Sequence, residues 1–254
     1  MAAAVPRALE RFFGEHPRPA LAFSGGADSA YLLAAARACG CDVAAYCVSS
    51  PFQPAFELAD ARRLADQLGA ALRVIPVDTL SDDVIRANPP DRCYHCKRAI
   101  FTALMDAARA DGRTVVIDGT NASDDADDRP GMRALEELGV LSPLRACSIT
   151  KAMVREYSRQ MGLFTWNKPA YACLATRIPA GTPLSAEVLT RVEGAEAALM
   201  ALGFSDMRVR LFHGAARLQF PAAQMERASG LRGEIRAALR PYFDIILIDT
   251  EDRG

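Results

Sequence analysis

The sequence has almost no net charge and lacks the features that mark secreted or membrane proteins. Its 254 residues include 30 lysines and arginines and 31 aspartates and glutamates, a formal net charge of −1. Without a net basic field the chain has no general attraction for nucleic acid, so we expect no nucleic-acid partner. No apolar run approaches the ~20 residues that span a membrane, and residues 1–7 lack the apolar stretch of a signal peptide. We therefore expect a cytoplasmic protein with no membrane partner.

Cysteine, in contrast, is present seven times. With no export signal, this number argues against a disulfide scaffold and favours thiol or metal chemistry in a reducing compartment. Cys39, Cys41 and Cys47 lie at a helix end or on a strand pattern, where we expect small buried side chains. Cys147 lies in a loop pattern and has no assigned role.

A glycine turn is the most informative segment. Residues 24–29, Ser-Gly-Gly-Ala-Asp-Ser, follow an apolar run directly and precede a helix pattern directly. The glycines let the backbone approach a ligand closely, and the first amides of a helix favour phosphate. Because the turn has no lysine it is not a Walker-type loop, and its glycine spacing is not the dinucleotide fingerprint. The turn is typical of enzymes that split ATP between its α and β phosphates.

Apolar runs that suit parallel strands alternate with helix patterns through the first two-thirds of the chain. This order predicts an α/β fold with a doubly wound parallel sheet. Ligands bind beyond the carboxyl ends of such strands, where residues 24–29 and 119–121 both lie. The expected strands are 20–23, 42–48, 72–77 and 114–118, and the expected helices are 54–68 and one that begins at 97.

A linker rich in proline and glycine at 179–183 separates the alternating strand and helix patterns from a different, α+β pattern. We expect one domain over residues 1–180 and a small α+β domain over residues 181–254. The second domain is expected to contain helices over 185–202 and 233–239 and strands over 207–212, 217–220 and 243–248.

Three further cysteines form a candidate site. Cys93 and Cys96 are two residues apart in a Cys-x-x-Cys pair, and Cys173 lies far along the chain. The pair can reach one metal or cluster. A zinc site, a redox dithiol and a [4Fe–4S] cluster held by three cysteines all fit this spacing, and the residues alone favour zinc and iron–sulfur equally.

Together these segments resemble the LarE family of ATP-dependent sulfur transferases, which belongs to the PP-loop superfamily of ATP pyrophosphatases (adenine nucleotide alpha hydrolase-like). The resemblance runs from the glycine turn to Arg208-Val209-Arg210. The matching segments occur in the family's order and are 88–97, 118–121, 128–131, 142–144, 150–151, 166–169 and 172–179.

The resemblance implies a function in the biosynthesis of the nickel-pincer nucleotide. ATP would adenylylate a carboxylate of pyridinium-3,5-biscarboxylic acid mononucleotide, and an enzyme-bound sulfur would replace AMP to give the thiocarboxylate. Members with three cysteines hold a [4Fe–4S] cluster, and this chain has the three at Cys93, Cys96 and Cys173. In the other version of the family, the cysteine that matches Cys173 gives up its own sulfur.

Residue roles follow from the same resemblance, with Asp28 and Cys173 as the catalytic residues. The phosphates of ATP, with Mg²⁺ nearby, would be bound by Ser24, Gly25, Gly26, Asp28 and Ser29. The nucleotide pocket would be closed by Gly119, Thr120 and Asn121. The substrate would contact Arg177, Arg208, Arg210, Glu196, Asp128 and Arg129. A homo-oligomer is expected, and the physiological sulfur donor is not named by the sequence.

Three other functions remain open on sequence alone. A tRNA thiolase also uses ATP and cysteines, although the chain lacks net basic charge and a zinc-ribbon set of cysteines. An enzyme similar to NAD synthetase would use ammonia and would not need the three cysteines. A non-catalytic module that binds nucleotide or metal would release no pyrophosphate.

Overall fold

The computed structural model describes residues 5–124 and 130–251 and divides into two compact units. Unit 1 comprises residues 1–79 and 91–168, and unit 2 comprises residues 80–90 and 169–254. None of the helices in the described ranges is both long enough and apolar enough to cross a lipid bilayer.

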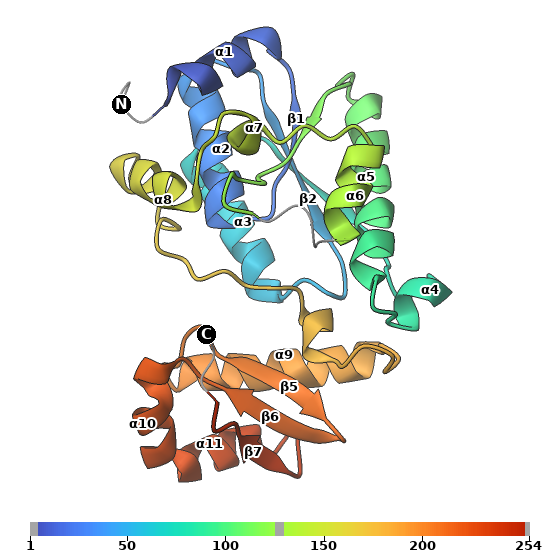
Figure 1. Ribbon diagram of the computed structural model, residues 1–254, viewed down its shortest axis with the longest axis vertical. Coiled ribbons are helices and arrows are strands. Elements are labelled where there is room, and N and C mark those ends of the chain that lie inside the picture. The colour runs from blue at the N-terminus through green and yellow to red at the C-terminus, as the bar shows by residue number, and fades with distance from the viewer. Residues whose placement is uncertain (1–4, 125–129, 252–254) are drawn as a thin grey trace. The chain divides into compact units, whose positions relative to one another are not determined.

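Unit 1 is an α/β unit in which helices flank a sheet that contains β1 and β2 (Figure 1). Its four strands are parallel and lie in the order β3-β2-β1-β4. Ala20 at the start of β1 pairs with Ala44 of β2 and with Val116 of β4, so β1 is central. The strands are β1 (Ala20–Ala22), β2 (Ala44–Ser49), β3 (Leu72–Pro76) and β4 (Val116–Ile117). The helices are α1 (Arg7–Glu15), α2 (Ala27–Ala38), α3 (Ala55–Gln67), α5 (Arg92–Ala110), α6 (Pro130–Glu137), α7 (Pro143–Ala146) and α8 (Lys151–Gln160).

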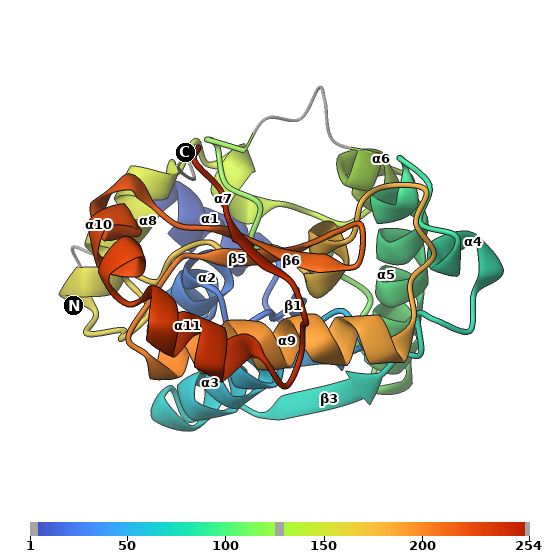
Figure 2. The ribbon, with the colours of Figure 1, turned by 90° about the horizontal axis from the view of Figure 1, so that it is seen from below.

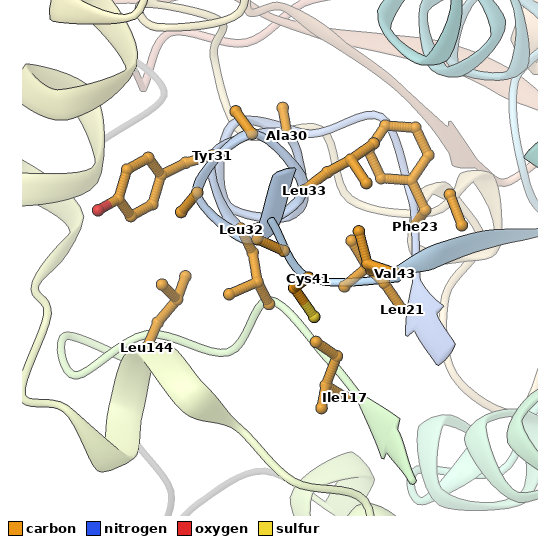
Figure 3. Packing of buried hydrophobic residues seen from close by; sticks show 14 of the residues in the cluster. Leu21, Phe23, Ala30, Tyr31, Leu32, Leu33, Cys41, Val43, Ile117 and Leu144 are labelled. Atoms are coloured by element: carbon orange, nitrogen blue, oxygen red, sulfur yellow. The ribbon is translucent and has the colours of Figure 1, made fainter. Parts of the chain in front are cut away.

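Helices cover both faces of this sheet. Because side chains alternate along a strand, Leu21 and Ile117 point to one face while Ala20 and Val116 point to the other. The first face packs against α2, whose buried residues include Leu32 and Leu33 (Figure 3). The second face packs against apolar residues of α5 and α6. The expected doubly wound parallel sheet is therefore confirmed.

Unit 2 contains the small α+β structure that the sequence predicts. Strand β5 pairs antiparallel with β6, which pairs parallel with β7. Helices α9 and α11 run along the same side of this sheet (Figure 2). The elements are α4 (Asp83–Arg86), the 3-10 helix η2 (Leu174–Arg177), α9 (Ala186–Ala201), β5 (Arg208–Phe212), β6 (Ala215–Gln219), α10 (Ala222–Gly230), α11 (Arg232–Leu239) and β7 (Ile246–Ile248).

The units do not divide the chain at residue 180, where the sequence places the boundary. Residues 169–180 and 80–90 both belong to unit 2. Asn88, which is 1% exposed, joins them because its amide Nδ2 donates to the carbonyl oxygens of Pro179 and Thr182 at 2.9 and 3.1 Å. Its φ of 56° is in the left-handed region, which asparagine tolerates better than most residues.

We predict that Leu33→Ala lowers the free energy of unfolding of unit 1 by about 2–5 kcal/mol, because it leaves a cavity under a fully buried side chain. Trp166 is the chain's single tryptophan and lies in unit 1, so urea unfolding followed by its fluorescence measures the change. The matched control is Leu141→Ala, at a position 37% exposed, for which a much smaller loss is expected. Equal losses in both variants would contradict the assigned core.

Candidate functional site

The glycine turn lies between β1 and α2, at the carboxyl end of the central strand. Gly26 is the N-cap of α2, so the first amide groups of the helix have no intrahelical acceptor. The hydroxyl oxygens of Ser24 and Ser29 are 3.2 Å apart, and the backbone amide of Gly26 donates to Ser24 Oγ at 3.3 Å. The turn thus gathers two hydroxyls and a helix N-terminus, an arrangement that suits an anion.

Two glycines are required by the tight packing around this turn. Gly25 has a φ of 74°, and a Cβ there would lie 2.9 Å from the backbone nitrogen of Ala61 in α3. Gly119, beyond the end of β4, lies so close to α2 that a Cβ would be 2.9 Å from the backbone nitrogen of Ser29. The segment after β4 and the glycine turn are therefore in direct contact, as the sequence predicts from their positions at strand ends.

Asp28 is held by two side chains from other segments. Lys151 Nζ, in the first turn of α8, lies 2.5 Å from Asp28 Oδ2. The side-chain amide of Asn121, which is 2% exposed, donates to Asp28 Oδ1 at 3.3 Å. These contacts fix the carboxylate at the N-terminus of α2, and Lys151 adds a positive charge that the glycine turn itself lacks.

Asp118 organises the segment that follows β4. It is 6% exposed, and its carboxylate accepts hydrogen bonds from Ser142 Oγ at 2.7 Å and from Thr120 Oγ1 at 2.5 Å. The backbone amide of Thr120 also donates to Asp118 Oδ1 at 3.2 Å. These bonds explain why Thr120 and its neighbour Gly119 keep a fixed position against the glycine turn.

A cavity of about 380 Å³ opens where these segments meet. Lys97 reaches it from the second turn of α5, and Gly131 makes room because a Cβ there would lie 2.9 Å from Lys97 Cδ. Carboxylates that suit Mg²⁺ and a lysine that suits phosphate therefore line one space. The lining residues are Ala22, Ser24, Asp28, Ser29, Lys97, Asp118, Gly119, Thr120, Asp124 and Met132.

The pair Cys93 and Cys96 lies in the first turn of α5, next to the lysine that lines the cavity. The expectation that this helix begins at Lys97 is wrong, because α5 begins at Arg92. Residues three apart on a helix share a face, so the two thiols face the same way. Arg92, only 7% exposed, donates from Nη2 to Cys93 Sγ at 3.6 Å.

Tyr94 ties the same helical turn to α6. Its hydroxyl donates to Glu137 Oε2 at 2.7 Å, and the Arg133 guanidinium lies 3.9 Å from the centre of its ring. Tyr94 is 9% exposed, whereas Cys93 is exposed and Cys96 is partly exposed. The buried tyrosine anchors the turn and leaves the two cysteines accessible.

In unit 2, arginines hold the loop that carries Cys173. Arg208 Nη2 donates to the carbonyl oxygen of Ala170 at 2.7 Å, and Arg177 Nη1 donates to that of Ala172 at 3.1 Å. Arg210 Nη1 donates to the carbonyl oxygen of Thr176 at 2.9 Å. Three of the four arginines that the sequence assigns to substrate binding, Arg177, Arg208 and Arg210, thus contact the cysteine loop.

Arg177 and Glu196 form a buried ion pair, each 1% exposed, with Nε and Oε1 2.7 Å apart. Burial opposes the charge of Arg177, but the bonds and attraction to Glu196 outweigh it and raise the arginine's pKa. Glu196 Oε1 also accepts from the backbone amide of Val209 at 2.9 Å, and the hydroxyl of Tyr171 donates to Oε2. Both side chains have internal partners, and substrate contact by either remains a prediction.

Sequence reasoning missed Lys97 and Lys151 as site residues, although it quoted the segments that contain them. The signal was the missing lysine in the glycine turn, because a phosphate site then needs a cation from another segment. Asp128 and Arg129 lie outside the described residues. Within the ranges 5–124 and 130–251, no three His, Cys, Asp or Glu side chains are gathered closely enough to hold a metal ion. Cys93 and Cys96 belong to unit 1 and Cys173 to unit 2.

Cys41 and Cys47 are both buried, as the sequence predicts. Cys39 is exposed, so the same prediction is wrong for that residue. Burial raises the pKa of Cys41 to about 11 and also raises the pKa of Cys47 and Cys147. A raised thiol pKa disfavours the reactive thiolate.

Comparison of the sequence with known proteins assigns the chain to a family. No protein-family model matches the chain. It is 37% identical over 210 residues to pyridinium-3,5-bisthiocarboxylic acid mononucleotide synthase of Lactiplantibacillus plantarum, which covers 82% of this chain and 76% of that protein. It is 38% identical to an uncharacterized protein of Synechocystis over 86% of this chain and 82% of the relative. A third relative, an uncharacterized protein of Methanocaldococcus jannaschii, is 30% identical over 78% of this chain and 76% of its own. The chain belongs to the LarE family, as its motifs indicate.

We predict that Glu196→Ala lowers the free energy of unfolding of unit 2 by about 3–5 kcal/mol, because it leaves the Arg177 guanidinium buried without a counter-charge. Hydrogen exchange of α9 and β5 peptides, read by mass spectrometry, measures the loss. The Arg177→Met/Glu196→Leu double variant, which removes both charges, should recover much of it.

The matched control for this prediction is Asp83→Ala, which removes an exposed ion pair with Arg86 in the same unit. Exposed pairs contribute little, so we expect no clear change in exchange. Comparable protection in Glu196→Ala and wild type would show that the buried pair does not stabilise unit 2.

Proposed function

We propose that the protein is an ATP-dependent sulfur transferase that acts on a carboxylate of pyridinium-3,5-biscarboxylic acid mononucleotide. One observation carries the proposal. Lys97, which lines the cavity at the glycine turn, directly follows Cys96 in the chain. The cavity that we propose for nucleotide phosphates and a pair of accessible cysteines are thus adjacent within unit 1. The name of the Lactiplantibacillus plantarum relative supports the same chemistry.

The first step would activate a poor electrophile. A carboxylate oxygen of the substrate attacks the α phosphorus of ATP, the bond from this phosphorus to the β-phosphate oxygen breaks, and pyrophosphate leaves. The helix amides at Gly26 and the hydroxyls of Ser24 and Ser29 would bind the leaving phosphates. Asp28 would hold the Mg²⁺ that accompanies ATP, and Lys97 would offset the charge that develops on pyrophosphate.

Lys151 would change partner when the nucleotide binds. In the structure its ammonium group lies against Asp28, the carboxylate that suits Mg²⁺. A metal on Asp28 would compete for that carboxylate, and the lysine would then be free to contact a phosphate oxygen. The lysine therefore offsets the charge of Asp28 before ATP arrives.

Sulfur would be delivered from a cluster that three cysteines hold. Cys93 and Cys96 share one face of α5 and are accessible, so the pair fits a [4Fe–4S] cluster. Cys173 in unit 2 would supply the third thiolate. When bound with three protein thiolates, the cluster would supply an iron that carries an exchangeable sulfide. The loop arginines would hold Cys173 for this role.

The alternative sulfur source is Cys173 itself. Its thiolate would attack the acyl carbon and displace AMP. Loss of the Cα proton with cleavage of the Cβ–S bond would then leave dehydroalanine and release the thiocarboxylate. The cysteine pair on α5 favours the cluster, because the sacrificial route requires no thiol other than Cys173.

We predict that the protein converts ATP to AMP and pyrophosphate in the presence of the mononucleotide, and that Asp28→Ala slows this on the order of 100-fold or more. Its physical reason is the loss of the carboxylate among the phosphate-binding amides. Chromatography of the nucleotide products measures the reaction. Asp106→Ala on α5, which removes an exposed pair with Arg109, should be unaffected. Release of ADP and phosphate by the wild type would overturn the proposal.

We also predict that anaerobic reconstitution gives a brown protein with about four irons per chain. Cys93→Ala, Cys96→Ala and Cys173→Ala should each lose iron, whereas Cys39→Ala should not, because Cys39 lies at the end of α2. Iron and sulfide analysis with absorbance spectroscopy measures retention. If only Cys173→Ala is inactive and active protein gains dehydroalanine at residue 173, the sacrificial route is correct instead.

A further inference from the structure

Tyr171 occupies the centre of the network beside Cys173. Two guanidinium carbons, those of Arg177 and Arg208, lie 4.6 and 5.0 Å from the centre of its ring. Its hydroxyl donates to Glu196, the carboxylate that also pairs with Arg177. One side chain thus contacts both of the arginines that bind the carbonyl oxygens of Ala170 and Ala172.

These contacts restrain the backbone on both sides of Tyr171. Arg208 holds the carbonyl of the residue before it, and Arg177 holds that of the residue after it, which directly precedes Cys173. Thr176 Oγ1 donates to the carbonyl oxygen of Cys173 itself at 2.8 Å. The main chain of the cysteine is therefore fixed from several directions, while its thiol stays partly exposed.

The ring of Tyr171 also offsets the repulsion between the guanidinium groups of Arg177 and Arg208. The guanidinium groups of Arg177 and Arg208 approach the same loop, where like charges would repel. The faces of an aromatic ring attract cations, and Glu196 supplies one nearby negative charge.

We propose that Tyr171 is a positioning residue for Cys173: its ring and hydroxyl hold the two arginines and Glu196 in the arrangement that fixes the cysteine loop. The assignment of sulfur chemistry to Cys173 rests on the proposed function, but the positioning itself does not. The side chain of Tyr171 need not contact substrate. It acts through the arginines that bind the loop carbonyls.

The test compares Tyr171→Phe, which keeps the ring and removes the bond to Glu196, with Tyr171→Leu, which removes both. The full-length protein, reduced and free of metal, is treated with iodoacetamide, and the alkylation rate of each cysteine is read by peptide mass spectrometry. We expect Cys173 to react about 3-fold faster in Tyr171→Phe and about 10-fold faster in Tyr171→Leu, because a loosened loop exposes the thiol. The rates at Cys93 and Cys96 should not change.

The kcat of sulfur transfer should fall by about 10-fold or more in the Tyr171 variants, with KM unchanged, because ~1 Å of misplacement of a reacting group can lower a rate about 100-fold.

Two controls separate positioning from stability. Tyr46→Phe removes a similar tyrosine–carboxylate hydrogen bond, to Asp111 in unit 1. Ile235→Val weakens the core of unit 2 through α11, at a position 1% exposed. Both should leave the Cys173 alkylation rate at the wild-type value.

Unchanged Cys173 alkylation in both Tyr171 variants would overturn the positioning role whatever the enzyme does. An equal acceleration in Ile235→Val would overturn it too, because general loosening of unit 2 would then explain the effect. If the wild type transfers no sulfur but Tyr171→Leu still accelerates alkylation of Cys173 alone, the positioning role stands and the proposed function fails.

Discussion

Burial of both faces of the parallel sheet is the constraint on which the rest of unit 1 depends. Alternate residues of β1 and β4 must be covered on opposite sides, so each strand leads into a helix that returns over one face. This winding brings the carboxyl ends of β1 and β4 together. The close contact between Gly119 and the backbone of Ser29 is a direct result. The cavity and its carboxylates exist because the core forces these two segments to meet.

Charge is arranged differently in the two units. Around the glycine turn, Lys97 and several carboxylates line a cavity, and Lys151 pairs with Asp28, so a ligand can replace that contact. Around Cys173, the arginines are committed to backbone carbonyls and to a fully buried glutamate. Replacing those contacts would leave buried groups without partners, which is costly. The first arrangement suits binding and release, and the second suits a permanent support.

The sequence was sufficient to predict the parallel sheet, the glycine turn at the carboxyl ends of its strands, and the contact between residues 24–29 and the segment after β4. Continuous apolar runs and glycine spacing are local signals, and strand ends converge by geometry alone. It could not predict that Arg208 and Glu196 have internal partners. Alternation along β5 places Arg208 and Arg210 on one face, but which groups cover that face depends on a loop distant in sequence. The same limit hid the pairing of Lys151 with Asp28, which are 123 residues apart.

The chain passes between the two units three times, after residues 79, 90 and 168. Neither unit is therefore a contiguous piece of sequence, and a gene fragment for residues 169–254 would lack the segment that carries Asn88. The side-chain amide of that residue donates to the carbonyl oxygens of Pro179 and Thr182, and the fragment would lose these bonds. On the ribosome, residues 80–90 emerge long before their partners and must wait for the rest of unit 2 to be synthesised. Insertion of unit 1 sequence into unit 2 thus makes the cysteine loop one of the late parts of the molecule to be completed.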